Sequence, residues 1–252
     1  LCDALPEEVF VIYRQSDPVW IMYKDNAMKE YEKKVYERAN LILVPRRKIG
    51  MKIPDEFQSK VRIWENGFNV PKVTDYKNPY AENGGKKAVY LGYTPIHRET
   101  LEAVAWKNQD CEFHIIGNCI SKASMVSISK RHKNVIFHGT LPADKYLGYI
   151  KYADFAFVPY ARIRALEYIG LNSKFLLFMF FGLPIVSYSV GAIDGNYGIF
   201  FVNNLQEFLE KIESVKKLGK IQYNIDWKYY SSEGRKGELK QILSNYREIW
   251  DA

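Results

Sequence analysis

The stretch KAVYLGYTPIHRETLEAVAWKNQDCEFHIIG, residues 87–117, predicts a strand, a helix and a second strand. Its first seven residues and its last seven (111–117) are apolar enough to be buried on both faces of a sheet. Residues 97–108 have the length and the apolar spacing of a helix. Strands that alternate with helices in this way are typical of parallel β-sheets.

The same alternation continues along the sequence. Further strands are expected over 134–139, 155–160 and 183–189, and helices over 121–132, 142–153, 172–181, 203–219 and 235–250. Upstream, the pattern predicts strands over 7–14, 40–45 and 61–68, and a helix over 25–39 with Asp25 as its N-cap. The sequence therefore predicts an α/β protein built on doubly wound parallel sheets.

A polar stretch rich in proline and glycine, residues 71–86, is typical of a linker. It separates a first unit over 1–70 from a second unit over 87–226, and 227–252 form a C-terminal helical segment. The chain begins at Leu1 rather than methionine and soon reaches an apolar strand. We therefore expect the first Rossmann-like unit to be incomplete.

Charge and cysteine content limit the classes of partner and compartment. The net charge of +7 favours anionic partners such as nucleotides, acidic sugars, nucleic acid or an anionic membrane surface. The three cysteines show no Cys-x-x-Cys spacing, which indicates neither a disulfide framework nor a zinc site and fits a reducing cytosol. No signal peptide or apolar run of membrane-spanning length is present in this sequence.

One cation lies at the start of an apolar helix in LNSKFLLFMFFGLPIVS, residues 171–187. Asn172 or Ser173 is suited to cap this helix, and Lys174 then falls in its first turn. The helix dipole disfavours a cation there by up to about 1 kcal/mol. A bound diphosphate would explain the lysine, since helix N-termini bind phosphate. The alternative is a lysine whose head simply reaches water from a buried helix.

Glycines follow three of the predicted strands. In doubly wound sheets ligands bind where the strands end, and glycine allows a ligand to approach the backbone. The strand ends are Gly92-Tyr93-Thr94, Gly117-Asn118, Gly139-Thr140 and Tyr160. For each glycine a tight strand-to-helix turn is an equally good explanation.

Several segments together resemble the GT-B glycosyltransferases. ALEYIGLNSKFLLFMFFGLPIVS (165–187) is similar to their nucleotide-sugar motif, and FFGLP within it resembles the xanthan-pathway glucuronosyltransferases. VPY (158–160), YEKKVYERANLILVP (31–45) and ENGF (65–68) follow the family's order, so the resemblance covers nearly the whole chain.

The resemblance implies an acceptor-side domain over 1–70, a donor-binding domain over 87–226 and a last helix that crosses back to the first domain. The resembling glucuronosyltransferases are inverting enzymes, while the sequence itself leaves the anomeric outcome open. No cofactor is expected, and no metal ion is expected, because the sequence has no Asp-x-Asp pair to bind one. Such an enzyme moves a sugar, with glucuronate expected, from a UDP-sugar to a lipid-linked or polysaccharide acceptor in bacterial cell-surface glycan synthesis.

A cytoplasmic location at the inner face of the membrane is expected. The basic segments KKLGKIQ (216–222) and DWKYYSSEGRKG (226–237) indicate peripheral membrane contact, with ordinary solvated surface as the alternative. No nucleic acid is expected, because no recognition-helix motif occurs and the 29 acidic residues disperse the basic charge.

The site residues follow from the strand ends and the resemblance together. Donor-nucleotide binding is expected at Gly92, Tyr93, Gly117, Gly139, Thr140, Tyr160, Asn172, Ser173 and Lys174. By resemblance to inverting members, Asp17 is the expected general base, although an Asp-Pro turn explains this residue slightly better. Asp25 is the second choice, with helix capping as its alternative.

Other functions stay open at this stage. Leu177 stands where the family often has a Glu or Gln that contacts the ribose, and no Asp-x-Asp pair occurs in the sequence. A non-catalytic nucleotide-sugar-binding protein is one alternative. A second GT-B enzyme, such as a nucleotide-sugar epimerase, is the other.

Overall fold

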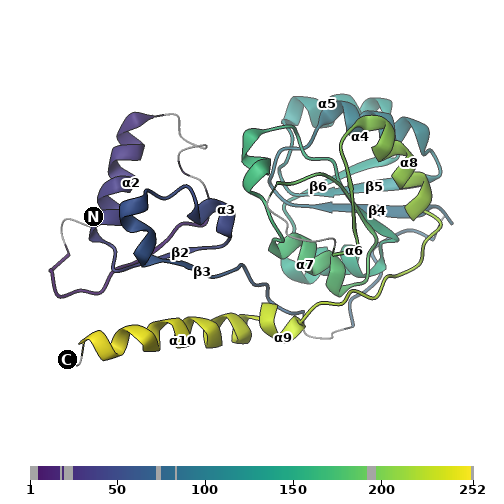
Figure 1. The fold of residues 1–252 in the computed structure, drawn as a ribbon. Coiled ribbons are helices and arrows are strands. Elements are labelled where there is room, and N and C mark those ends of the chain that lie inside the picture. The colour runs from purple at the N-terminus through teal and green to yellow at the C-terminus, as the bar shows by residue number, and fades with distance from the viewer. Residues whose placement is uncertain are drawn as a thin grey trace.

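The computed structural model describes residues 5–17, 19, 25–71, 75–82, 84–191 and 197–250. The described chain contains two parallel β-sheets, and Figure 1 shows them in separate bodies side by side. The smaller sheet lies in the N-terminal part and the larger one in the middle and C-terminal part. Both sheets are parallel, as the alternation of strands and helices predicts.

The smaller sheet has the order β1-β2-β3 and is parallel throughout. Its elements are β1 (Ile12–Arg14), α2 (Asn26–Arg38), β2 (Leu41–Val44), α3 (Arg47–Gly50), the 3₁₀ helix η2 (Asp55–Lys60) and β3 (Val61–Ile63). Asp25 caps α2 as predicted, because its carboxylate accepts a hydrogen bond from the backbone N–H of Ala27 at 2.9 Å. All four residues of β2 are buried, so this central strand is covered on both faces.

The larger sheet has the order β6-β5-β4-β7-β8-β9, again parallel throughout. Its strands are β4 (Lys86–Leu91), β5 (Cys111–Ile116), β6 (Val135–Gly139), β7 (Phe155–Val158), β8 (Ile185–Tyr188) and β9 (Ile199–Val202). This is the doubly wound strand order, and its direction of winding reverses between β4 and β7.

Helices cover both faces of the larger sheet (Figure 1). They are α4 (Arg98–Lys107), α5 (Lys122–Arg131), α6 (Ala143–Tyr152), the 3₁₀ helix η3 (Arg164–Tyr168), α7 (Ser173–Phe180) and α8 (Leu205–Val215). α4, α5 and α8 lie on one face, and α6 and α7 on the other. The central strands are therefore apolar on both sides, and β7 is buried along its whole length. Each fully buried Val or Phe contributes about 1.5–3 kcal/mol to folding.

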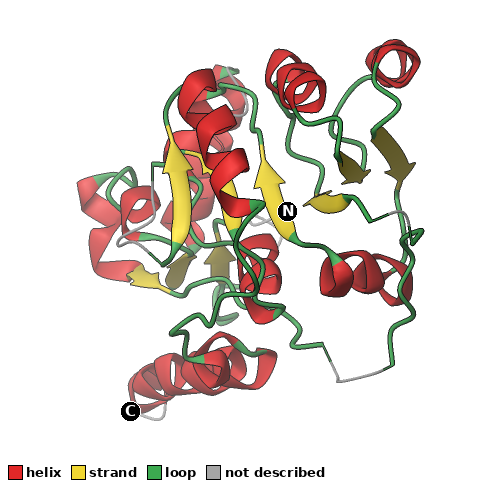
Figure 2. Cartoon of the chain, turned by 90° about the vertical axis from the view of Figure 1, so that its right-hand side faces the viewer, coloured by secondary structure: helices red, strands yellow, loops and turns green. Residues whose placement is uncertain are grey.

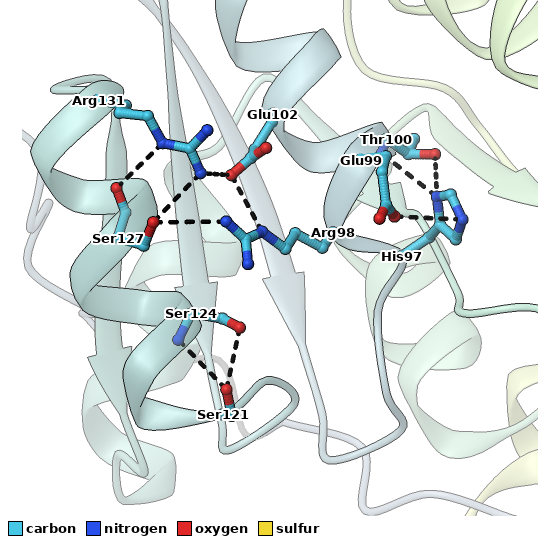
Figure 3. Close-up of polar contacts among 9 residues, drawn as sticks. All are labelled: His97, Arg98, Glu99, Thr100, Glu102, Ser121, Ser124, Ser127 and Arg131. Atoms are coloured by element: carbon cyan, nitrogen blue, oxygen red, sulfur yellow. Dashed lines mark hydrogen bonds and ion pairs between the residues drawn. The ribbon is translucent and has the colours of Figure 1, made fainter.

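Polar contacts hold α4 and α5 of the larger body together, as Figure 3 shows. Glu102 of α4 accepts hydrogen bonds from the guanidinium groups of Arg98 and Arg131, and Arg131 belongs to α5. His97 caps α4 by accepting from the backbone N–H of Thr100, and Ser121 caps α5 in the same manner. Glu102 therefore joins α4 to α5, and the two caps fix the starts of these helices.

Two chain segments join the two bodies. Residues 64–85 lead from β3 to β4, and the chain returns through α9 (Trp227–Tyr230) and α10 (Ser232–Trp250), which runs along the bottom of both views (Figures 1 and 2). The two crossings touch, because the backbone N–H of Phe68 donates to the carbonyl of Tyr230 at 3.0 Å. Trp64 Nε1 also donates to the carbonyl of Arg235 at 3.0 Å. α10 packs on the first body through Tyr246, whose ring lies 5.7 Å from that of Phe10.

Three expectations from the sequence need correction. The strand predicted over 7–14 is confined to β1, because the guanidinium of Arg38 binds the carbonyls of Pro6 and Val9 and holds that segment as turns. The strand predicted over 61–68 ends at Ile63, where the chain turns toward the second body. β9 was not predicted at all, although IFFV has the composition of a buried strand.

Candidate active site

The loops that follow β4 and β7 meet where the winding of the larger sheet reverses. In doubly wound sheets this is the position of the ligand crevice. Gly92 follows β4 and Tyr160 follows β7, and α7 begins a short distance beyond Tyr160. The structure therefore brings three of the sequence-predicted residues, Gly92, Tyr160 and Lys174, to one point.

The ammonium of Lys174 lies between two aromatic rings at this point. Its Nζ atom is 4.4 Å from the centre of the Tyr90 ring and 4.5 Å from that of Tyr160. The nitrogen is buried and has no hydrogen-bond partner among the described residues, although the lysine residue as a whole is partly exposed. Ammonium–ring attraction offsets only about 0.5–2 kcal/mol of the cost of desolvation. The site thus contains a cation without a counter-ion.

Burial lowers the pKa of Lys174 from its usual range to about 7, and the nearby Cys119 thiol opposes this shift. The two flanking phenols cannot act as a counter-ion for the ammonium. Burial raises the pKa of both Tyr90 and Tyr160, that of Tyr160 to about 12. Both tyrosines are therefore neutral near pH 7 and supply no anion. An anionic ligand would restore full charge to the lysine.

Asn172 and Ser173 are engaged in structural contacts. The side-chain oxygen of Asn172 accepts from the backbone N–H groups of Lys174 at 3.1 Å and Phe175 at 3.2 Å, which makes Asn172 the N-cap of α7. The hydroxyl of Ser173 donates to the carbonyl of Gly67 at 2.9 Å and so ties α7 to the first chain crossing. The cap therefore uses two of the N–H groups that the sequence interpretation assigned to a phosphate.

The three strand-end glycines differ in what surrounds them. All have positive φ angles, 141° for Gly92, 111° for Gly117 and 63° for Gly139. A Cβ atom at Gly117 would lie 2.2 Å from the carbonyl oxygen of Gly92, so backbone packing alone requires this glycine. At Gly92 a Cβ would lie 3.1 Å from Lys174 Nζ, whereas at Gly139 nothing lies within 4 Å. Only Gly139 opens onto free space.

Tyr93 and Thr140 lie together at the rim of the strand ends. The hydroxyls of the two residues are 3.3 Å apart, and the Asn118 amide is 3.5 Å from Thr140 Oγ1. Tyr93 is 63% exposed, in contrast to the fully buried Tyr160. Of the two predicted tyrosines, Tyr93 is therefore the one with an accessible ring, while Tyr160 supports the lysine.

Asp17 lies beyond the end of β1, is exposed, and faces an arginine that the sequence interpretation missed. Burial lowers the pKa of Arg46, while the carboxylates of Asp17 and Glu65 and the phenol of Tyr160 raise it. Arg46 also donates to the carbonyl of Tyr168 at 2.9 Å, across the two bodies. It directly follows Pro45 after β2, so the strand-end rule that selected Gly92 would have selected it. Asp25, the second candidate base, is occupied as the cap of α2.

A cavity of about 690 Å³ lies between the two bodies, beside the first turn of α7. Its walls come from the ends of β1 and β3, the first crossing, and the helices α6, α7 and α10. Ser173 and Leu177 line it from α7, and Arg14 lines it from β1. Its volume falls in the usual range for small-molecule sites.

The described residues contain neither a group of three or more His, Cys, Asp or Glu side chains that could hold a metal ion nor a helix suited to cross a membrane.

Comparison with known proteins shows the fold and finds a family match over part of the chain. Residues 95–217 match the family model "Glycosyl transferases group 1". Among solved structures, the chain resembles the lipopolysaccharide outer core galactosyltransferase WaaB with a TM-score of 0.58 and 15% identity, over 97% of this chain and 77% of that one. It resembles Anabaena Alr3699/HepE, solved in complex with UDP-glucose, with a TM-score of 0.58 and 12% identity, over 96% and 71% of the two chains. The chain therefore has the GT-B fold of these solved structures, and a little under half of it matches a glycosyltransferase family model.

The chain is also similar in sequence to a protein of known activity. Over 175 residues the chain is 27% identical to the UDP-glucuronate:glycolipid 2-beta-glucuronosyltransferase of Xanthomonas campestris pv. campestris. The match covers 65% of this chain and 42% of that relative, so this chain spans less than half of the relative's length.

Proposed function

We propose that this chain transfers a sugar from a nucleotide diphosphate sugar to a glycan hydroxyl. The observation that carries the proposal is the buried ammonium of Lys174 at the reversal point of the larger sheet, for which the described part of the chain offers no hydrogen-bond acceptor. A buried cation without an anion is unfavourable, and it is explained if an anion binds there during the reaction cycle.

In the proposed reaction, Lys174 turns away from the rings of Tyr90 and Tyr160 and binds the diphosphate. The acceptor hydroxyl attacks the anomeric carbon, the bond from that carbon to the diphosphate oxygen breaks, and the nucleotide leaves with the negative charge. Lys174 stabilises this charge in a low-dielectric site, where such interactions are strongest. A single displacement of this kind inverts the anomeric configuration.

Asp17 is proposed to accept the proton of the acceptor hydroxyl. It lies at the end of β1, on the body opposite Lys174, so donor and acceptor would meet between the two bodies. Arg46 is proposed to keep this region compact, since its guanidinium bridges to Tyr168 of the second body. The residues Gly139, Thr140 and Tyr93 are proposed to border the nucleoside, because they form the accessible rim of the strand ends.

The identities of donor and acceptor are part of the same proposal. UDP-glucuronate is proposed as donor and a glycolipid as acceptor, because the Xanthomonas relative is named for both. Action at the inner face of a bacterial membrane, without a metal ion, belongs to this proposal as well. An assay with and without EDTA checks the last point.

Calorimetric titration tests the proposed function. UDP, UDP-glucuronate and GDP are titrated against the wild-type chain and the variants Lys174→Ala and Lys220→Ala. Lys220 is a suitable control, since burial also lowers the pKa of this lysine, to about 8, but it donates to the carbonyls of Lys151 and Ala153. We expect the uridine ligands to bind and Lys174→Ala alone to weaken them. Unchanged affinity in Lys174→Ala would remove the lysine from the site.

A further inference from the structure

The cavity between the two bodies carries an excess of positive charge. Arg14, Arg235 and Lys236 line it, and Glu65 is the single carboxylate among the described residues of its wall. Glu65 is already hydrogen-bonded, because it accepts from the Tyr229 hydroxyl at 3.0 Å. The cavity therefore favours a ligand with negative charge.

Arg235 has an unused donor. The residue is 4% exposed, and its guanidinium stacks 3.6 Å above the Tyr229 ring. Nη1 donates to Glu238 and Nε to the carbonyl of Tyr229, whereas the buried Nη2 has no partner among the described residues. A buried donor left unsatisfied costs about 1–3 kcal/mol. An anionic oxygen in the cavity would offset this cost after a small movement of the neighbouring side chains.

The rest of the cavity wall is mostly apolar. Val70 and Pro71 of the first crossing, Leu147 of α6, Leu177 of α7 and Leu239 of α10 line it. A small inorganic anion would leave these side chains uncovered. A ligand with an apolar portion next to its anionic group would contact both parts of the wall.

The cavity also touches the elements that carry both proposed reaction centres. Arg14 ends β1, and Asp17 follows three residues later in the same loop. Ser173 begins α7 and lines the cavity, and Lys174 is the next residue. An occupant of the cavity therefore lies beside the proposed base and the proposed diphosphate site.

We propose that this cavity binds the acceptor through a phosphate group attached to an apolar chain. Arg14 and Lys236, with the free Nη2 of Arg235, bind the phosphate oxygens, and the leucine-lined wall takes the first part of the chain. Arginine suits phosphate, because its planar donors match the geometry of the oxygens. The assignment to the acceptor rests on the proposed function, whereas the binding of a phosphate amphiphile is independent of it.

The test uses n-octyl phosphate as probe, below its micelle concentration, with n-octyl glucoside and inorganic phosphate as comparison ligands. Calorimetry measures each against the wild-type chain and the variants Arg14→Gln, Lys236→Gln and Lys240→Gln. Lys240 is the matched control, an exposed lysine one turn further along α10 that does not line the cavity. Circular dichroism and thermal unfolding check that each variant is folded.

We expect n-octyl phosphate to bind more tightly than either comparison ligand. Arg14→Gln and Lys236→Gln should each weaken it about 5-fold to 20-fold, as expected for the loss of one partly exposed charged hydrogen bond. Lys240→Gln should leave it unchanged. Equal affinities in Lys236→Gln and Lys240→Gln would overturn the proposal. So would octyl glucoside or inorganic phosphate binding as tightly as the probe, or displacement of the probe by UDP.

Lys174→Ala separates this proposal from the proposed function. It should weaken UDP binding and leave n-octyl phosphate binding unchanged. If no nucleotide binds to the wild type while the probe shows the expected pattern, the cavity assignment stands and the donor assignment falls. If UDP binds as expected and the probe does not bind, the reverse holds.

Discussion

The Nζ atom of Lys174 lies 4.5 Å from the centre of the Tyr160 ring, with the Tyr90 ring at a similar distance. The ammonium therefore has aromatic contacts but no anionic partner among the residues that the structure describes. Such an arrangement is poorly stabilised without a ligand and becomes favourable with one. Stability and affinity should consequently change in opposite directions when the lysine is replaced.

Replacement of Lys174 by methionine tests whether stability and nucleotide affinity change in opposite directions. Lys174→Met keeps the length of the side chain and removes the desolvated charge, so we expect the free energy of unfolding to rise by about 1–3 kcal/mol. Nucleotide affinity should fall in the same variant. Thermal unfolding and calorimetry measure the two effects. A variant that is less stable than the wild type would show that the ammonium has a stabilising partner.

The lowered pKa of Lys174 predicts that donor binding depends on pH. A bound diphosphate favours the charged lysine and raises its pKa above the value of about 7 that it has in the free protein. Below pH 7 the lysine is charged with or without ligand, and affinity is flat. Above pH 7 binding requires proton uptake, so affinity should fall by up to about tenfold per pH unit.

UDP-glucose suits this measurement better than UDP. Its diphosphate is esterified at both ends and, unlike the terminal phosphate of UDP, does not titrate near pH 7. Calorimetry from pH 6 to 9 in buffers of different ionisation enthalpy gives both affinity and proton uptake. In Lys174→Ala the dependence should disappear. A flat profile in the wild type would contradict the link between Lys174 and the diphosphate.

The loss of stability on Gly→Ala substitution at the three strand-end glycines should depend on which atoms the added methyl group contacts. Gly117→Ala should be the most destabilising, since its Cβ would overlap the carbonyl of Gly92. Gly139→Ala should cost only the backbone strain of about 1–2 kcal/mol. Gly92→Ala combines a strained φ with a contact to Lys174 Nζ, so it should also weaken nucleotide binding. Thermal unfolding and UDP titration of the three variants measure these differences. Equal losses of stability in all three variants would refute the predicted order.

Asp17→Asn and Asp25→Asn are matched variants that test which carboxylate acts as the general base. If Asp17 accepts the acceptor proton, Asp17→Asn should lower kcat by about 100-fold to 10,000-fold with little change in UDP affinity. Asp25→Asn should be silent, because asparagine caps a helix as well as aspartate does. A transfer assay on both variants makes the comparison. Full activity in Asp17→Asn would eliminate this residue as the base.

A pair of stacked histidines, one buried and one half-buried, predicts a loss of stability in acid. The rings of His114 and His138 stack, with His114 Nδ1 2.9 Å from His138 Nε2. Burial lowers the pKa of His114 to about 4, against a weaker opposing effect of Glu112, and burial also lowers that of His138. Since the unfolded chain takes up protons first, stability present above pH 6.5 is lost toward pH 4, by about 3 kcal/mol for His114.

Urea unfolding between pH 7 and pH 4.5 measures this loss. His114→Gln keeps a polar side chain that does not titrate, so its stability should fall less steeply over this range than that of the wild type. Parallel slopes for the two proteins would show that the pair does not titrate differently on unfolding.

The fold was predictable because its pattern is local. Runs such as FAFV in β7 and the capped helices α4 and α5 carry their own signals of apolar content and capping, and all lie within two residues of their predicted bounds. β1 was overestimated, since the contacts of Arg38 that keep 6–9 out of the sheet come from a distant helix.

The site was predictable only in part. Sequence patterns placed Lys174 beside the strand ends, but its orientation depends on the rings of Tyr90 and Tyr160, which belong to other strands. Ser173 contacts Gly67 of the first crossing, Arg46 approaches Asp17 from a neighbouring strand end, and Arg46 also donates to Tyr168 of the second body. No local pattern in either segment encodes such contacts.

A crystal structure of the chain with UDP tests the central claim most directly. We predict that Lys174 Nζ leaves the faces of Tyr90 and Tyr160 and lies within hydrogen-bond distance of a diphosphate oxygen. An ammonium still stacked between the two rings, with the nucleotide bound elsewhere, would contradict the account.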